Sequence, residues 1–356
     1  MEFLSEYGLF LAKAVTIVAA VFLVILFIGA ISQRARRPDR KGRLRVSCLN
    51  DHFDELQDMM RFAVLDKDEV KRIQKEQRKK HKVEQKERKD ARKRAESAEQ
   101  KEPVNRKRIY VLNFTGDMEA GEVDCLREEI SAVISMANSI DEVLLRLESP
   151  GGMVNAYGLA SSQLLRLRDQ KIPLTICVDK VAASGGYMMA CLADKLIAAP
   201  FAIIGSIGVL VQLPNFHRVL KKNNVDFEII SAGEFKRTLT VFGEITQKGR
   251  DKVQEDVENI HDLFKGWVKD HRPDVEIDRI STGETWVGTQ AMDRGMVDEI
   301  KTSDECIVEA CENADVFEVD YEFRKSIQDR FDGMLEQSLN RIFSRWIERS
   351  STEKYQ

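Results

Sequence analysis

Histidine is scarce in this chain, with five residues among 356, and none belongs to a His-Glu-x-x-His or comparable cluster. Metal-dependent hydrolases need such clusters, because imidazole and carboxylate groups must converge on one ion. We therefore expect no metal and no cofactor. We also expect each histidine to be an ordinary surface or capping residue. The five are His52, His81, His217, His261 and His271.

Cysteine is sparse too, and its six residues lack the spacing of a zinc site or of a small disulfide-bonded scaffold. Cys177 and Cys191 stand in apolar runs, which predicts that both are core residues.

Charged side chains are absent from residues 14–31. At a rise of about 1.5 Å per residue, a helix of this length spans about 27 Å, close to the hydrocarbon thickness of a bilayer. A secretory signal peptide is the alternative, but that class begins with basic residues and ends at a small-x-small cleavage site. This N-terminus carries Glu2 and Glu6 instead. We therefore expect residues 1–33 to form an uncleaved transmembrane anchor.

Aromatic residues are absent from residues 67–108, where 18 basic and 9 acidic residues give a net charge of +9. Such a stretch cannot build a hydrophobic core. Nucleic-acid binding is not expected, because the charges are mixed and no aromatic side chain is present for base stacking. We interpret residues 34–107 as a basic juxtamembrane linker, either a solvated spacer or an arm attracted to anionic lipid headgroups. Within it, residues 51–65 have the apolar spacing of a short amphipathic helix.

From residue 108 onward, apolar runs alternate with amphipathic stretches. The alternation predicts βαβ units and an α/β domain with a largely parallel sheet, over residues 108–321. Residues 322–356 carry apolar side chains at helical spacing, which predicts a C-terminal amphipathic helix. Strands are expected at 109–114, 142–147, 174–178, 196–199 and 227–231, and helices at 121–137, 154–168 and 250–269.

Ser184 stands in a turn of small residues, Val-Ala-Ala-Ser-Gly-Gly-Tyr at 181–187, between a predicted strand and a helix-like stretch. The N-terminal amides of a helix stabilise nearby negative charge, which suits a nucleophilic oxygen. A serine needs a base to become a nucleophile, and Lys236 at the end of Gly-Glu-Phe-Lys is a candidate. Burial lowers the pKa of a lysine enough for such a role. Taken alone, the Ser-Gly-Gly tripeptide more often marks an ordinary glycine turn that opens a packed helix.

Two further glycine turns supply possible supporting groups. Gly151 and Gly152 follow the predicted strand at 142–147, and their amides are suited to stabilise a developing oxyanion. Ser206, in Gly-Ser-Ile-Gly at 205–208, is placed to hydrogen-bond a lysine. Each turn also fits a purely structural role.

Four of these motifs occur in order: Ser-Pro-Gly-Gly at 149–152, Ala-Ala-Ser-Gly-Gly-Tyr at 182–187, Gly-Ser-Ile-Gly-Val at 205–209 and Gly-Glu-Phe-Lys at 233–236. The series resembles that of the signal peptide peptidase A (S49) family of membrane serine proteases. The later segments at 282–291 and 295–298 also match the family pattern. The resemblance covers roughly residues 105–320, and an ordered series is far more specific than one motif.

The resemblance implies a role for each site residue. Ser184 would be the nucleophile, Lys236 the general base, and Ser206 the residue that orients the lysine. The oxyanion hole would be formed by amides around Gly151, Gly152 and Gly185. Phe235 stands where the family often has tyrosine, which should not affect the chemistry.

The resemblance also implies a ClpP/crotonase-like α/β core behind an N-terminal transmembrane helix in a bacterial inner (cytoplasmic) membrane. It implies peptide or membrane-protein substrates, such as signal-peptide remnants, and a homo-oligomeric ring. Some members complete each site with a lysine from the neighbouring subunit. Family members commonly work outside the cytoplasm, whereas the seven basic residues between positions 34 and 45 place that flank inside. The side that holds the catalytic domain is left open.

Two other functions fit parts of the sequence. The same fold hosts acyl-CoA enzymes, but those have no use for a serine paired with a lysine. A non-catalytic membrane scaffold is the third reading. Covalent labelling by an active-serine probe separates the protease from both.

Overall fold

The computed structural model describes residues 42–66, 68–73 and 106–323, together with Lys13, Val15, Thr16, Lys75 and Lys79. The chain divides into one compact unit over residues 44–321 and a second that joins residues 1–43 with 322–356. Among the described residues, no helix is both long and apolar enough to cross a bilayer. The expected span at 14–31, apart from Val15 and Thr16, lies outside the described part, as do most of the linker and the C-terminal helix. Those assignments stay predictions.

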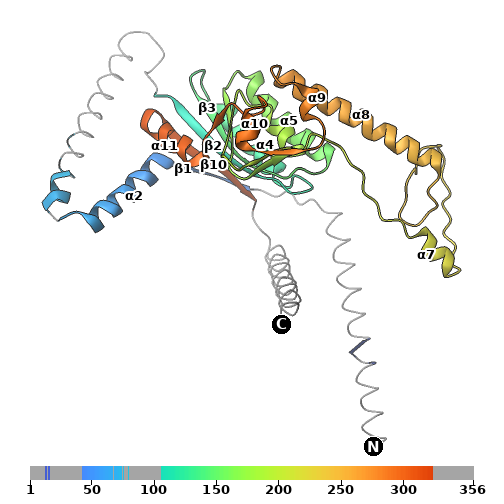
Figure 1. Ribbon diagram of the computed structural model, residues 1–356. Helices are drawn as coiled ribbons and strands as arrows, with labels where there is room; N and C mark the ends of the chain where they lie inside the picture. Colours follow the sequence, from blue (N-terminus) through green and yellow to red (C-terminus); the bar gives the residue numbers. More distant parts are fainter. Residues whose placement is uncertain are drawn as a thin grey trace, which may run out of the picture. The chain divides into compact units, whose positions relative to one another are not determined.

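Strands and helices alternate along the larger unit, as the sequence predicts (Figure 1). The strands are β1 (Gly42–Cys48), β2 (Arg108–Thr115), β3 (Glu142–Glu148), β4 (Leu174–Val178), β5 (Val181–Ala183), β6 (Lys195–Ala198), β7 (Ile203–Gly205), β8 (Thr285–Val287), β9 (Glu299–Ile300) and β10 (Asp315–Phe323). The helices are α2 (Leu49–Val64), α4 (Val123–Met136), α5 (Val154–Asp169), α6 (Gly185–Ala190), α7 (His217–Lys222), α8 (Gln247–His271), α9 (Ile277–Ile280), α10 (Gly288–Met292) and α11 (Ser303–Asn313).

Ten strands form two sheets in the described residues. The larger sheet has the order β1-β10-β2-β3-β4-β6-β9, and the pairs from β10 to β9 are all parallel. The smaller sheet has the order β5-β7-β8, with β5 and β7 parallel. Ser149 joins the two, because its N–H donates to the Val181 carbonyl and its own carbonyl accepts from Ala183 N–H. The ends of β3 and β5 therefore lie side by side, at the carboxyl edge where α/β proteins gather their sites.

Alternating side chains of the large sheet enter two different cores. In β2, Tyr110, Leu112 and Phe114 face the larger core, whereas Ile109 and Val111 face the smaller one. Successive side chains of a strand point to opposite faces, so both faces of the sheet are covered. The larger core lies under α4, α5, α6 and α8, and the smaller one under α2 and α11. Cys177 and Cys191 are both buried, which confirms the prediction.

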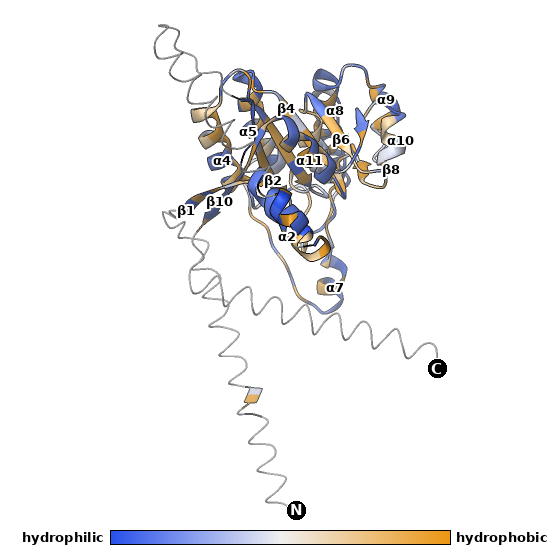
Figure 2. Cartoon of the chain, turned by 90° about the vertical axis from the view of Figure 1, so that its left-hand side faces the viewer, coloured by the Kyte–Doolittle hydropathy of each residue, from blue (hydrophilic) through white to orange (hydrophobic). Residues whose placement is uncertain are grey.

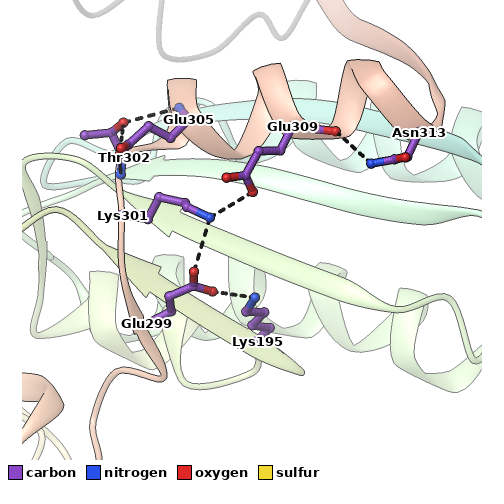
Figure 3. Close-up of polar contacts among 7 residues, drawn as sticks. All are labelled: Lys195, Glu299, Lys301, Thr302, Glu305, Glu309 and Asn313. Atoms are coloured by element: carbon purple, nitrogen blue, oxygen red, sulfur yellow. Dashed lines mark hydrogen bonds and ion pairs between the residues drawn. The ribbon is translucent and has the colours of Figure 1, made fainter.

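A chain of ion pairs fixes α11 to the sheet (Figure 3). Lys301 bridges Glu299 of β9 and Glu309 of α11, and Glu299 also pairs with Lys195 of β6. Thr302 caps the N-terminus of α11 in a capping box with the side chain of Glu305. Ion pairs as well as apolar packing therefore hold α11 against β6 and β9 in the described part of the chain.

The amphipathic helix expected at 51–65 is confirmed as α2. Its first turns pack on the smaller core through Leu49 and Phe53, while Leu56, Met59 and Met60 are exposed. Figure 2 accordingly shows hydrophilic and hydrophobic residues on this one helix.

The strand expected at 227–231 is wrong. These residues have no regular secondary structure, and Ile230 is 92% exposed. Phe227 packs on Phe242, with ring centroids 5.7 Å apart, instead of joining a sheet. A strand needs a partner to satisfy its backbone, and no sheet edge reaches this part of the described chain.

Glu129 of α4 makes the stability of the fold depend on pH. It is 3% exposed, and burial raises the pKa of its carboxyl from 4.5 to about 7. The folded state therefore holds this proton more tightly than the unfolded chain. The free energy of unfolding should fall as pH rises from about 4.5 to about 7. We expect Glu129→Gln to remove this loss and to raise the free energy of unfolding at pH 8 by about 1–3 kcal/mol.

Thermal unfolding followed at pH 5.5 and pH 8 measures this effect. Glu119→Gln is the control, because Glu119 is exposed. Equal pH dependence in the wild type and Glu129→Gln would contradict the prediction.

Candidate active site

Ser184 occupies a strained turn between β5 and α6. Its φ is 52° and its ψ is −118°, a backbone conformation that residues other than glycine rarely adopt. The same kind of sharp strand-to-helix turn exposes the nucleophile of α/β-hydrolases. The Ser184 N–H donates to the Gly205 carbonyl at 2.8 Å. The expected strand-to-helix junction is thus present, and its backbone is held from the neighbouring strand β7.

The glycine loop after β3 lies against this turn. Gly151 has a φ of +88°, and a Cβ added there would lie 2.7 Å from the Ser184 Cβ. A Cβ on Gly152 would lie 2.3 Å from the Met118 carbonyl oxygen. Only glycine permits this approach of the two segments.

The Gly151 amide already has a partner. It donates to Ser149 Oγ at 3.1 Å, and that hydroxyl lies 2.6 Å from Tyr157 Oη, which donates to the Asp117 carbonyl. The Gly152 amide has no hydrogen bond to any described residue. Gly185 begins α6, where helical amides lack intrahelical partners. Of the three residues expected to form the oxyanion hole, Gly152 and Gly185 therefore have backbone N–H groups that are not already used in a hydrogen bond with another described residue.

A cavity of about 770 Å³ brings these parts together. Ser184, Ser206, Gly151, Gly152 and Gly185 all line it, so five of the six predicted site residues share one wall. Most of the remaining lining is apolar: Met118, Met153, Val154, Met188, Val209, Leu210, Ile260 and Phe264. Within the described residues, no group of three or more His, Cys, Asp or Glu side chains could hold a metal ion.

Lys236 is the predicted site residue that the chain does not bring to the cavity. Its side chain is exposed, and it is absent from the described residues that line the cavity. The adjacent Phe235 ring lies 5.7 Å from Lys248 Nζ, near the start of α8. Ile260, which lines the cavity, comes about 12 residues later in α8, roughly 18 Å along the axis. Within one chain, Lys236 and Ser184 therefore belong to different regions.

Lys236 belongs to an arm, residues 209–246, that connects β7 to α8 and carries α7 (Figure 1). The arm is held together by Asn215, whose amide donates to the Thr240 and Gly243 carbonyls, both at 2.9 Å. Many of its apolar side chains are nevertheless exposed. Leu210, Val211, Val219, Val225, Phe227, Ile229, Ile230 and Phe235 are all exposed. Apolar side chains exposed in this number favour an interaction surface.

His261 is a cavity residue that the sequence did not reveal. It lies in α8 and lines the cavity, and its Nε2 is 3.3 Å from the Ile207 carbonyl oxygen. His261 is partly exposed, and its place at the cavity is a feature that the expectation of an ordinary surface or capping residue did not include. In the sequence, the one indication was that His261 lies beside Ile260 and Phe264 on the apolar face of a long predicted helix. Only the packing of that helix near Ser184 shows that this face lines the cavity.

Gly185→Ala is expected to disrupt the site. The added Cβ would lie 2.4 Å from Tyr157 Cγ, and Tyr157 is fully buried and fixed by its hydroxyl contacts. We expect a destabilisation of about 1–3 kcal/mol or more, with loss of Ser184 reactivity. Gly158→Ala is the matched control in α5, because its Cβ would meet no atom within 4 Å. Thermal unfolding and serine labelling distinguish the two, and equal behaviour would contradict the packing argument.

Comparison with known proteins identifies the family. The model for the peptidase family S49 N-terminal domain matches residues 2–164, and the model for peptidase family S49 matches residues 166–317. The chain is 47% identical over 352 residues to a "Probable protease SohB" of Haemophilus influenzae, an alignment that covers 99% of this chain and 98% of the relative. The chain belongs to peptidase family S49.

Other relatives extend this family assignment. A "Probable protease SohB" of Buchnera aphidicola subsp. Acyrthosiphon pisum is 44% identical, with 96% of each chain covered. "Protease 4" of Haemophilus influenzae is 30% identical over 211 residues, which span 57% of this chain and 34% of the relative. As an S49 member the chain is a peptidase. The matched regions contain the glycine loop, Ser184, Ser206 and Lys236.

Proposed function

We propose that this S49 peptidase is a membrane-anchored serine endopeptidase in which Ser184 is the nucleophile and Lys236 the general base. The strained backbone at Ser184, beside two unengaged amides in an apolar cavity, is the observation that carries the proposal. An acyl-CoA enzyme of the same fold has no need for such a serine. We take the two-sheet core as ClpP/crotonase-like, and the apolar segment at 14–31 as the anchor in a bacterial inner membrane.

In the proposed reaction, Ser184 Oγ attacks the substrate carbonyl carbon while its proton passes to Lys236 Nζ. The N–H groups of Gly152 and Gly185 donate to the resulting oxyanion. The C–N bond then breaks, and the lysine returns the proton to the leaving amine. A water molecule, deprotonated by the same lysine, hydrolyses the acyl ester and frees Ser184.

Lys236 acts in this proposal from a neighbouring subunit. Two observations support it: the Ser184 cavity contains no lysine among its described lining residues, and Lys236 is exposed on an apolar arm. An arm of this kind is suited to pack on a second copy, which would place the base in the neighbour's cavity. The assembly is then a closed ring of subunits, with the lipid bilayer and peptide substrates as its other partners.

Fluorophosphonate labelling of the full-length protein in detergent, followed by peptide mapping, tests the proposed function. The probe forms a covalent bond to an activated serine, so we expect the label on Ser184. A protein that is folded and oligomeric but unlabelled would defeat the serine-protease assignment.

Substrates are expected to bind extended, with small or apolar side chains next to the cut. The cavity presents Met118, Met153, Met188 and Phe264, and no Asp, Glu, Lys or Arg is among its described lining residues. An extended peptide is also able to pair with a free strand edge. Cleavage of a peptide library measures the preference. Dominant selection of Arg, Lys, Asp or Glu immediately before the cut would contradict it.

A further inference from the structure

The segment at residues 205–208 contacts the backbone of the nucleophile, Ser184, and contains Ser206, the residue expected to orient the lysine. Gly205 accepts the hydrogen bond from the Ser184 N–H, and the Ser206 N–H donates to the Glu284 carbonyl at 2.7 Å. Ser206 has a φ of 54°, so its backbone is strained as well. Strained residues keep their conformation only when their surroundings hold them. Whatever fixes this segment therefore also fixes the backbone position from which the Ser206 side chain extends.

His261 supplies the one side-chain hydrogen bond to this segment among the described residues. Its Nε2 contacts the Ile207 carbonyl at 3.3 Å, whereas the Ser184–Gly205 and Ser206–Glu284 bonds join backbone groups. A carbonyl oxygen only accepts, so Nε2 carries the proton and donates it. Ile207 itself is fully buried. Loss of the His261 donor would leave its carbonyl without this partner.

We propose that His261 is a positioning residue that holds the Ile207–Gly208 peptide group and, through it, Ser206 and the cavity wall. The inference rests on the proposed Ser184 chemistry. Because the C=O and N–H of one trans peptide point in opposite directions, a carbonyl fixed toward α8 turns the Gly208 N–H away from α8. Gly208 lines the cavity, and its N–H has no hydrogen bond to a described residue. This amide is therefore unengaged among the described residues at the cavity and available to a substrate carbonyl.

A positioning role and a general-base role for His261 predict different results when other side chains replace the imidazole. Glutamine places an N–H close to where histidine has Nε2, and it cannot take up a proton. Asparagine is one bond shorter and places its N–H closer to where histidine has Nδ1. If His261 acts by donating to Ile207, glutamine restores function and asparagine does not. If it took the Ser184 proton, both replacements would be equally inactive.

The test compares His261→Ala, His261→Asn and His261→Gln in the full-length protein in detergent. Measured quantities are kcat and KM for a peptide found by library cleavage, and the rate of fluorophosphonate labelling. We expect alanine and asparagine to lower kcat/KM by about 10- to 100-fold, and glutamine to recover most of that loss. His271→Ala is the control: His271 lies in the same helix, its Nδ1 is 2.7 Å from the Trp267 carbonyl, and it is not among the cavity's lining residues.

Hydrogen exchange of residues 205–210 gives a readout that needs no activity. Exchange should rise in His261→Ala and return toward the wild-type rate in His261→Gln. Equal loss in all three variants, no loss in any, or the same loss in His271→Ala would overturn the inference. A wild-type protein without serine labelling would instead defeat the proposed function, and exchange would still decide the role of His261.

Discussion

Ser184→Ala is expected to abolish peptide hydrolysis and fluorophosphonate labelling while leaving the fold intact. The substitution removes one oxygen, and the backbone contacts that hold the turn, from the Ser184 N–H to Gly205 and from the Met188 N–H to the Ser184 carbonyl, do not involve it. A lost nucleophile lowers turnover by about 10³-fold or more, because only binding and oxyanion stabilisation are left. Initial rates on a cleaved library peptide measure the loss of activity, and thermal unfolding of the same sample measures whether the fold is intact.

Ser162→Ala is the matched control for this result. Ser162 is an exposed serine of α5 whose hydroxyl donates to the Gly158 carbonyl, and it is absent from the described lining of the cavity. It should keep full activity. Retained hydrolysis in a clean Ser184→Ala preparation would remove Ser184 from the mechanism.

Lys236→Arg is expected to be as inactive as Ser184→Ala. Arginine keeps the positive charge and much of the length of lysine, but it does not release a proton in proteins. The expected loss in kcat is again about 10³-fold or more, because serine attack needs a base. Lys221→Arg, an exposed lysine of α7 on the same arm, should behave as wild type. An active Lys236→Arg variant would show that another group takes the proton.

Mixing two inactive variants tests whether Lys236 acts across the subunit boundary. A Ser184→Ala subunit still carries its lysine, and a Lys236→Ala subunit still carries its serine. If the base comes from a neighbour, hybrid rings contain some complete sites and recover part of the activity. Co-expression provides the mixed oligomers, and mass analysis shows that both chains are present. No recovery in such oligomers would mean that each subunit builds its own site.

The local geometry of the site could be predicted from the sequence to a useful degree. Gly151, Gly152, Ser184 and Ser206 stand at strand ends, and parallel strands bring such ends to one edge of a sheet. Their convergence on one cavity therefore follows from the alternation of strands and helices. What the sequence could not give is the hydrogen bond from the Gly151 amide to Ser149, because that depends on where Tyr157 packs.

Long-range packing explains the other differences. The apolar run at 227–231 has the composition of a strand, yet no described sheet edge accepts it, and its side chains stay exposed on the arm. His261 carries no motif, and its position follows from how α8 rests on α6, where Trp267 donates to the Met188 carbonyl at 3.0 Å. Neither fact is encoded by neighbouring residues, so local patterns cannot show it.

The separation of Lys236 from Ser184 has a consequence for when such an enzyme works. If Lys236 acts from a neighbouring subunit, a chain that meets no second copy has a nucleophile without its base, and newly made molecules would not digest their surroundings. If the chain is also anchored in a membrane as proposed, the frequency of encounters between subunits would depend on their surface density. Activity would then rise more steeply than the number of molecules, because each working site needs two of them. Under this proposal, proteolysis would depend on the local density of subunits in the membrane rather than on a single polypeptide.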